Sequence, residues 1–301
     1  MENKYKNKIS GNYFMSYRDN SEYEKAEIII LPVSYEGTCT YKKGTANAPK
    51  AILEASLNLD PFDEELFFSL EKKGICTLKM QKFSEKEESK KVVEKTKELT
   101  KQILKDNKFP VIIGGEHSIS IGSIQACAKK YSNLSVLQLD AHTDLEKAFQ
   151  GNEYSHASMA YKTIKTTKAK FSQVGIRSIN KEVIKEARKT KTSIFYSHNI
   201  INKKHKISEI VESLNKNVYL TLDVDVFDPS IFPNTGTPEP NGLKWQYIIN
   251  LIREISKYKN IVGFDLMEHS SKNPKNPHYS DFSAAKLINK ILCIIFKNKI
   301  K

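Results

Sequence analysis

Three short motifs rich in histidine and aspartate each follow a run of aliphatic residues. The first is Gly114-Gly115-Glu116-His117-Ser118, in which two glycines allow a sharp turn that presents His117 at the start of a helix. The second is Asp140-Ala141-His142-Thr143-Asp144, and the third is Asp223-Val224-Asp225. Alternate side chains of an extended strand point to the same side. We therefore predict that the acidic and imidazole side chains converge within each motif.

Four carboxylates and two imidazoles gathered in this way predict a metal centre. Burying so much negative charge is costly unless cations neutralise it, and two divalent cations fit the ligand count better than one. Oxygen-rich ligands with imidazole and without thiolate favour manganese or magnesium over structural zinc; iron, cobalt and nickel are alternatives. The predicted ligands are His117, Asp140, His142, Asp144, Asp223 and Asp225.

Each of these residues, taken singly, also has an ordinary structural interpretation. An aspartate at a strand end is usually a cap or a turn residue, and a histidine after two glycines is usually packed or solvated. Neither role explains the paired alternation or its recurrence at three strand ends, so we favour the metal centre for the whole set. Three other histidines lie in polar stretches and are predicted to be surface residues: His198, His205 and His278.

The elements that position the motifs are predicted from alternating β-branched runs and amphipathic stretches. Strands are expected at 28–31, 111–113, 134–139, 218–226 and 261–266. Helices are expected at 46–56, 84–106, 118–131, 181–189, 207–214, 243–255 and 283–296, with Ser84 and Glu87 at capping-box spacing. This pattern predicts an α/β fold with a mostly parallel sheet, helices on both faces, and chemistry beyond the carboxyl ends of the strands.

The length of the chain sets its domain organisation. The 301 residues are enough for one large core, and we predict a loosely attached polar arm at 1–24 and one catalytic domain at 25–301. Residues 270–280, rich in Asn, Pro and Lys, are expected to form an irregular loop.

Composition limits the compartment and the partners. No apolar run is long enough to span a bilayer, and the N-terminus lacks a signal-peptide pattern, so we expect a cytoplasmic protein without a membrane partner. The four cysteines show no CxxC spacing and are expected to be reduced thiols. A net charge of +13 is compatible with a nucleic-acid partner. The lysines alternate with glutamates and isoleucines, however, and this pattern favours a solvated surface instead.

The three motifs resemble, in order and content, the metal-binding signatures of the arginase and agmatinase superfamily of ureohydrolases. The segment 35–52 is also similar to a loop and helix of agmatinase-like members. The resemblance spans most of the chain and implies a three-layer α/β/α sandwich, two Mn²⁺ per subunit, and a homotrimer or homohexamer. It implies that one manganese is bound by His117, Asp140, Asp144 and Asp223, and the other by Asp140, His142, Asp223 and Asp225. Asp140 and Asp223 would bridge the two ions.

The resemblance implies hydrolysis of a guanidinium compound to urea and an amine. The resonance of a guanidinium makes its carbon a poor electrophile, and a hydroxide bridging two metal ions roughly 3.5–4 Å apart is a nucleophile strong enough to attack it. By the same resemblance Asp144 passes a proton to the leaving nitrogen, His156 is a proton shuttle, and Glu268 grips the guanidinium through a forked contact. The ordinary alternatives are a loop residue for His156 and an exposed cap for Glu268.

Agmatine is the predicted substrate, which would give putrescine and urea and a role in polyamine biosynthesis. Segment 236–243 resembles agmatinases more than arginases. In arginases an asparagine two residues after the last aspartate of the second motif contacts the substrate carboxylate. Here that position is Glu146, which would repel a carboxylate and attract an amine; Glu153 is a second candidate. The chain departs from the agmatinase pattern after His156 and after Glu268, so arginine, aminopropylagmatine and guanidinobutyrate stay open as substrates.

Functions of other classes make different predictions. A nucleic-acid binder would show salt-sensitive affinity, and it gives no reason for clustered acids. A non-catalytic, metal-binding regulatory homologue would be expected to lack some ligands, whereas all six are present. A single-zinc deacetylase of related fold would not need His117 and Asp144. The sequence therefore favours an agmatinase-type ureohydrolase.

Overall fold

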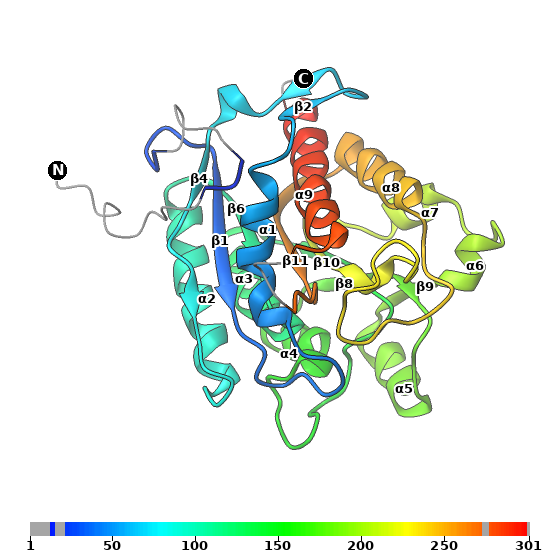
Figure 1. The fold of residues 1–301 in the computed structure, drawn as a ribbon. Helices are drawn as coiled ribbons and strands as arrows, with labels where there is room; N and C mark the ends of the chain where they lie inside the picture. The colour runs from blue at the N-terminus through cyan, green and yellow to red at the C-terminus, as the bar shows by residue number, and fades with distance from the viewer. Residues whose placement is uncertain (1–12, 16–21, 273–276, 300–301) are drawn as a thin grey trace.

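A parallel sheet forms the centre of the chain, as Figure 1 shows for the described residues 13–15, 22–272 and 277–299 of this computed structural model. The strand order is β4-β1-β6-β11-β10-β7-β8-β9, with β5 also beside β1, and each of these neighbouring pairs is parallel. The strands are β1 (Ile28–Ser34), β4 (Ile75–Thr77), β5 (Gln81–Lys82), β6 (Phe109–Ile113), β7 (Leu134–Leu139), β8 (Lys170–Ile176), β9 (Ser193–Tyr196), β10 (Asn217–Asp223) and β11 (Asn260–Met267). A short antiparallel hairpin joins β2 (Phe62–Asp63) to β3 (Phe68–Ser69).

Helices cover both faces of the sheet, which confirms the predicted three-layer α/β/α arrangement. On one face α1 (Ala48–Ser56), α7 (Ile207–Glu212), α8 (Trp245–Tyr258) and α9 (Tyr279–Asn298) pack together and against the larger apolar core. On the other face lie α2 (Ser89–Lys105), α3 (Ser120–Lys130), α4 (Met159–Thr167) and α5 (Lys181–Thr190). The short α6 (Ser197–Ile201) follows β9. Among the described helices, none is both long and apolar enough to cross a membrane.

The composition of the central elements follows from this layering. Every residue of β6 is buried and apolar, because a parallel strand covered on both faces needs a continuous apolar run rather than an alternating one. Helix α8 buries one stripe of aliphatic side chains, Ile248, Ile249, Leu251, Ile252 and Ile255, and the period of that stripe is the one expected for a helix on a sheet.

The predicted strands and helices are all present, with shifted boundaries and a few omissions. The predicted strand 218–226 is wrong at its end: β10 stops at Asp223, because Asp223 Oδ1 accepts the Asp225 N–H at 2.9 Å and the chain turns into a 3-10 helix. Ser84 does not cap a helix; it forms a turn with Glu87, and α2 begins at Ser89. The omitted elements include β8, β9 and α4.

Two described residues of the predicted N-terminal arm pack against the domain. Phe14 and Met15 are buried, and their backbone N–H groups donate to Thr77 Oγ1 and Ser56 Oγ. The rest of that arm up to residue 21 lies outside the described residues. The predicted loop 270–280 is shortened because α9 already begins at Tyr279, and its residues 273–276 also lie outside the described part. The four cysteines are free thiols, as predicted.

Candidate metal centre and active site

The three motifs lie side by side at the carboxyl edge of the sheet. Strands β6, β11, β10 and β7 are consecutive neighbours, and the chain leaving each of them carries candidate site residues. His117 follows β6, Asp140 follows β7, Asp223 ends β10 and Glu268 follows β11. Because parallel strands end at one edge, residues far apart in the sequence meet there.

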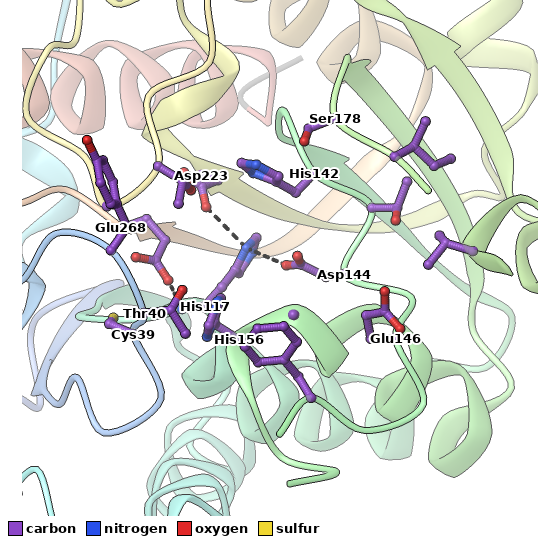
Figure 2. A pocket seen from close by; sticks show the side chains of 18 of the residues that line it. Cys39, Thr40, His117, His142, Asp144, Glu146, His156, Ser178, Asp223 and Glu268 are labelled. Atoms are coloured by element: carbon purple, nitrogen blue, oxygen red, sulfur yellow. Dashed lines mark hydrogen bonds and ion pairs between the residues drawn. The ribbon is translucent and has the colours of Figure 1, made fainter. Parts of the chain in front are cut away.

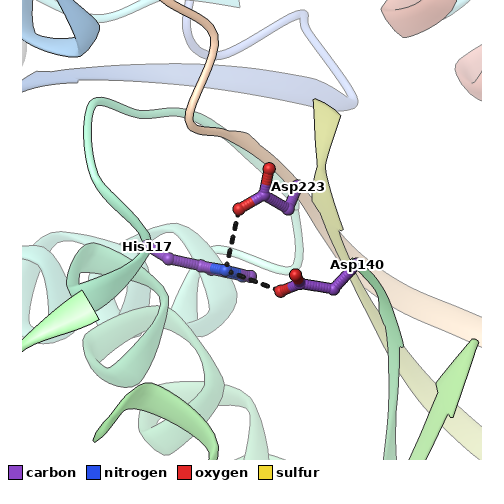
Figure 3. A group of neighbouring side chains, drawn as sticks. All are labelled: His117, Asp140 and Asp223. Atoms are coloured by element: carbon purple, nitrogen blue, oxygen red, sulfur yellow. Dashed lines mark ion pairs between the residues drawn. The ribbon is translucent and has the colours of Figure 1, made fainter. Parts of the chain in front are cut away.

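His117 is the centre of the first group of candidate ligands. Its Nδ1 atom lies 3.2 Å from Asp140 Oδ2, 3.1 Å from Asp144 Oδ2 and 3.4 Å from Asp223 Oδ2, an arrangement seen in Figures 2 and 3. The sharp turn before it requires Gly115, because a Cβ there would lie 1.9 Å from the carbonyl oxygen of Tyr35.

Hydrogen bonds behind His117 direct the lone pair of Nδ1 toward the carboxylates. Thr221 Oγ1 donates to Asp265 Oδ1 at 2.6 Å, so it accepts from His117 Nε2, which lies 2.8 Å away. In the neutral ring Nδ1 is then unprotonated, and it has no hydrogen-bond partner among the described residues. Burial lowers the pKa of His117, but the three carboxylates outweigh it and raise that pKa well above its usual value when no cation is bound. A buried, unpaired nitrogen facing three carboxylates is the environment of a metal ligand whose tautomer is fixed from behind.

The second group consists of Asp140, His142 and Asp225. His142 Nδ1 lies 2.9 Å from Asp225 Oδ2 and 3.7 Å from Asp140 Oδ1. Asp140 belongs to both groups, and Asp223 belongs to the first one. Spacings near 3 Å suit neighbouring ligands of an octahedral ion with bonds of about 2.1 Å, so the residues fit two adjacent divalent cations.

The structure brings all six predicted ligands together, although not on extended strands. Asp144 has a positive φ of 50°, and Asp225 lies in the 3-10 turn after β10. The backbone oxygen of Asp144 accepts from the N–H groups of Ala160 and Tyr161, which holds the turn against the start of α4. The predicted alternation was therefore wrong locally, while the convergence that it implied is observed.

A cavity of about 400 Å³ opens beside the two groups, and most of the other candidate residues line it. Glu268 is buried, and its Oε1 accepts the His117 backbone N–H at 2.8 Å. Glu146 lines the cavity and accepts from Asn180 Nδ2 at 2.7 Å. Among the described residues, the lining includes His156 but not Glu153, whose exposed carboxylate pairs with Lys162 Nζ at 2.6 Å.

Comparison with known proteins identifies the family. Residues 26–293 match the model of the arginase family. The chain belongs to the arginase family. This arginase-family chain is 34% identical over 271 residues to an N(1)-aminopropylagmatine ureohydrolase of Thermus thermophilus, covering 89% of this chain and 90% of that protein. It is 32% identical over 265 residues to an agmatinase of Pyrococcus horikoshii, covering 87% and 90%.

A solved structure supports the same assignment. The crystal structure of agmatine ureohydrolase of Thermoplasma volcanium is similar with a TM-score of 0.84 at 27% sequence identity, covering 96% of each chain. The resemblance inferred from the three motifs is thus confirmed, and the protein is an arginase-family ureohydrolase with a candidate metal site.

Several residues that support the arginase-family site were missed in the sequence. Arg177 donates from its guanidinium to the backbone oxygens of Asp225, Phe227 and Glu239 at 2.6, 3.3 and 2.8 Å, which ties β8 to the loop of the third motif. Thr221 and Asp265 were read only as strand residues. The one available signal was polarity inside otherwise aliphatic strands, because a buried polar group needs a partner.

Without a bound cation, several titratable groups at the candidate site of this arginase-family chain have raised pKa values. Burial, with the charge of Asp140, raises the pKa of Asp144 to about 6, and burial with Asp225 and Asp140 raises that of Asp223 well above its usual range. Burial with Glu116 raises the pKa of Glu268 to about 8. Burial lowers the pKa of His142, but Asp225 and Asp140 outweigh it and raise that pKa to about 12.

We predict that metal-free and manganese-loaded protein respond oppositely to pH. The pKa of Asp144 rises from 3.8 to about 6, and that of Glu268 from 4.5 to about 8. The folded protein then binds more protons than the unfolded chain, so its stability falls as pH rises between about 4 and 8; the raised pKa of His142 acts in the same direction above 6.5. Metal binding needs deprotonated ligands and strengthens as pH rises.

The measurement is the melting temperature between pH 6 and 8.5, with EDTA or with excess Mn²⁺. The gap between the two curves should widen with pH. Parallel curves would contradict the assignment of these residues to a metal centre.

Proposed function

We propose that this arginase-family ureohydrolase hydrolyses agmatine to putrescine and urea with two Mn²⁺ bound per subunit. The observation that carries the proposal is the buried nitrogen of His117 facing three carboxylates, beside a cavity that has further carboxylates in its wall. Manganese is proposed because oxygen-rich ligands with imidazole and no thiolate suit it. The predicted homotrimer or homohexamer is part of the proposal and is tested by light scattering of the purified protein.

The bound cations would supply charge neutralisation for the carboxylates and a water of lowered pKa next to the substrate. The other tasks belong to side chains of the chain itself. Glu268 would hold the guanidinium, because Oε1 is already anchored by the His117 N–H and the carboxylate faces the cavity. Asp144 lies in both the ligand cluster and the cavity wall, where its carboxylate can take a proton and give it to the leaving nitrogen.

The distal end of the substrate would meet Glu146. This carboxylate is held by Asn180 in the cavity wall, and it would attract the terminal ammonium of agmatine and repel the carboxylate of arginine or guanidinobutyrate. Aminopropylagmatine is a second candidate, because it also ends in an ammonium and because the relative from Thermus thermophilus bears that substrate in its name.

The test is urea release by the manganese-loaded protein from agmatine, aminopropylagmatine, arginine and guanidinobutyrate side by side. We expect kcat/KM for the better of the two amines to exceed that for arginine by about 100-fold, the equivalent of about 2.7 kcal/mol. A preference for arginine or guanidinobutyrate would contradict the proposed substrate class. No urea from any of the four would contradict hydrolysis of these guanidinium compounds.

Glu146→Gln is expected to lower kcat/KM for agmatine about tenfold, mainly through KM, because loss of one partly solvated charge contact costs about 1.4 kcal/mol. The arginine rate should rise because the repulsion is removed. Steady-state kinetics on both substrates measure the change. Glu153→Gln provides the comparison: its carboxylate is exposed and paired with Lys162, so agmatine kinetics should stay as in the wild type. An unchanged KM in Glu146→Gln would show that Glu146 does not set specificity.

A further inference from the structure

Thr38 lies between a buried carboxylate and the ring of His156. Its backbone N–H donates to Glu116 Oε2 at 2.6 Å, and its hydroxyl donates to Glu116 Oε1 at 2.7 Å. On the other side, the hydroxyl oxygen accepts the backbone N–H of His156 at 3.0 Å and lies 3.0 Å from His156 Nδ1. One hydroxyl therefore connects segments that are 78 and 118 residues away in the sequence.

The donors around Glu116 decide which way the Thr38 hydroxyl points. Glu116 is fully buried, and it accepts from the Thr38 N–H, the Thr38 hydroxyl and the Ser118 hydroxyl. A side chain surrounded by donors acts as an acceptor, so the single hydroxyl proton of Thr38 is used toward Glu116. The remaining capacity of the Thr38 oxygen is two lone pairs, and the neighbouring His156 offers its backbone N–H and Nδ1.

We propose that Thr38, oriented by Glu116, fixes His156 as the tautomer that carries its proton on Nδ1 and leaves the lone pair of Nε2 for the cavity. Thr38 and Glu116 are thus positioning residues for His156. This inference rests on the proposed function for its kinetic consequence, but the tautomer itself is a property of the folded chain.

The tautomer determines what His156 can do for the substrate. With Nδ1–H bonded to Thr38, Nε2 can accept a proton, which gives an imidazolium whose Nδ1–H still donates to the same hydroxyl. The proton that Nε2 takes from a water in the cavity then passes to the solvent, while Asp144 protonates the leaving nitrogen, so the neutral ring is restored and the proton count balances over one cycle. The opposite tautomer would present an N–H to the cavity and could not take up the proton there.

A purely structural role for Thr38 makes a different prediction. Thr38 belongs to the loop between β1 and α1, and Glu36 holds the same loop by accepting from the N–H groups of Gly44 and Ala46. If Thr38 only closed this loop, its loss would loosen the cavity wall and raise KM. It would not change the position of the proton on His156.

The test uses the full-length protein and three variants. Thr38→Val keeps the shape of the side chain and removes the hydroxyl, and Thr38→Ser keeps the hydroxyl. Glu116→Gln reverses the direction of the hydrogen bonds that run from residue 116 through Thr38 to His156. In Glu116→Gln the amide oxygen keeps the Thr38 N–H, the amide NH₂ donates to Thr38 Oγ1, and the Thr38 hydroxyl then donates to His156 Nδ1. The ¹⁵N shifts of His156, with Mg²⁺ in place of paramagnetic Mn²⁺, report the tautomer, and kcat, KM and bound metal are measured in parallel.

We expect the Nδ1–H tautomer in the wild type and Thr38→Ser, and the Nε2–H tautomer in Glu116→Gln. We expect kcat in Thr38→Val to fall about tenfold, in the range seen for groups that orient a functional imidazole, with KM and metal content unchanged and with most of the rate restored in Thr38→Ser. An Nε2–H tautomer in the wild type would overturn the proposal, as would an unchanged tautomer in Glu116→Gln. If Thr38→Val does not fold, Glu116→Gln decides; if the wild type releases no urea, the ¹⁵N shifts still decide, and only the proposed function fails.

Discussion

Asp140→Asn is expected to release the bound metal and to lower urea production by at least about 1,000-fold. Asp140 is the residue shared by the two candidate ligand groups, so its loss removes a charged oxygen from both at once. Its Oδ2 also accepts from Gln138 Nε2, and its Oδ1 from the His142 N–H. An asparagine at this position would present an NH₂ group to one of these donors or to a cation. Loss of nucleophile activation by metal accounts for an effect of this size.

The measurements are metal content, urea release and thermal stability of the same preparations. Mn²⁺ at about 100 times its dissociation constant should stabilise the wild type by about 2.7 kcal/mol, which is a rise of about 4 °C in melting temperature for a chain of this size. Asp140→Asn should show no such rise. Asp60→Asn, an exposed aspartate outside the cavity lining, is the matched control and should bind and respond as the wild type. Full metal binding by Asp140→Asn would contradict the shared-ligand arrangement.

The sequence was informative where one short motif carries several functional groups. The strand at 134–139 and its Asp-Ala-His-Thr-Asp ending were found because four of the six residues of β7 are leucine or valine, and the histidine and the aspartates follow directly at its end. Strand β8 was missed because its run Lys-Phe-Ser-Gln-Val-Gly-Ile mixes polar and apolar residues, yet six of its seven residues are buried. Ser172 and Gln173 are accommodated there by hydrogen bonds to Ser213, Gln138 and Thr143, which no local pattern encodes.

The parts of the site that depend on tertiary contacts could not be predicted. The sequence offers Glu146 as the first candidate and Glu153 as the second, and only the fold places Glu146 beside Asn180 in the cavity and Glu153 on the surface beside Lys162. Thr38 is likewise an unremarkable loop residue until Glu116 and His156 are brought to it. The spacing of metal ligands within one motif can be read from the local sequence. The orientation of those ligands and of the substrate depends instead on contacts with segments far away in the sequence.

Glu268→Gln separates substrate binding from metal binding and is expected to lower kcat/KM for agmatine about 100-fold with metal content unchanged. The amide oxygen can accept the hydrogen bond from the His117 N–H that Glu268 Oε1 accepts in the wild type. The amide NH₂ then takes the place of Oε2, on the side of Gly236. Oε2 lies 3.4 Å from the point where a Cβ atom would stand if residue 236 were not glycine. A guanidinium has only donors, so this NH₂ would oppose it where a carboxylate accepts two charge-assisted hydrogen bonds worth about 1.5–3 kcal/mol each.

Asp140→Asn is the variant with which Glu268→Gln is compared. Both variants should lose activity, but only Asp140→Asn should lose bound metal. Steady-state kinetics and metal analysis of Glu268→Gln are read together with those of Glu268→Asp, which keeps the charge but withdraws it by one methylene and should retain more activity than the amide. Metal loss in Glu268→Gln would instead assign Glu268 to the ligand cluster, through its contact with the His117 backbone. A wild-type kcat/KM in that variant would mean that another group holds the guanidinium, and the carboxylates left in the cavity wall are then Asp144, Glu146 and Asp223.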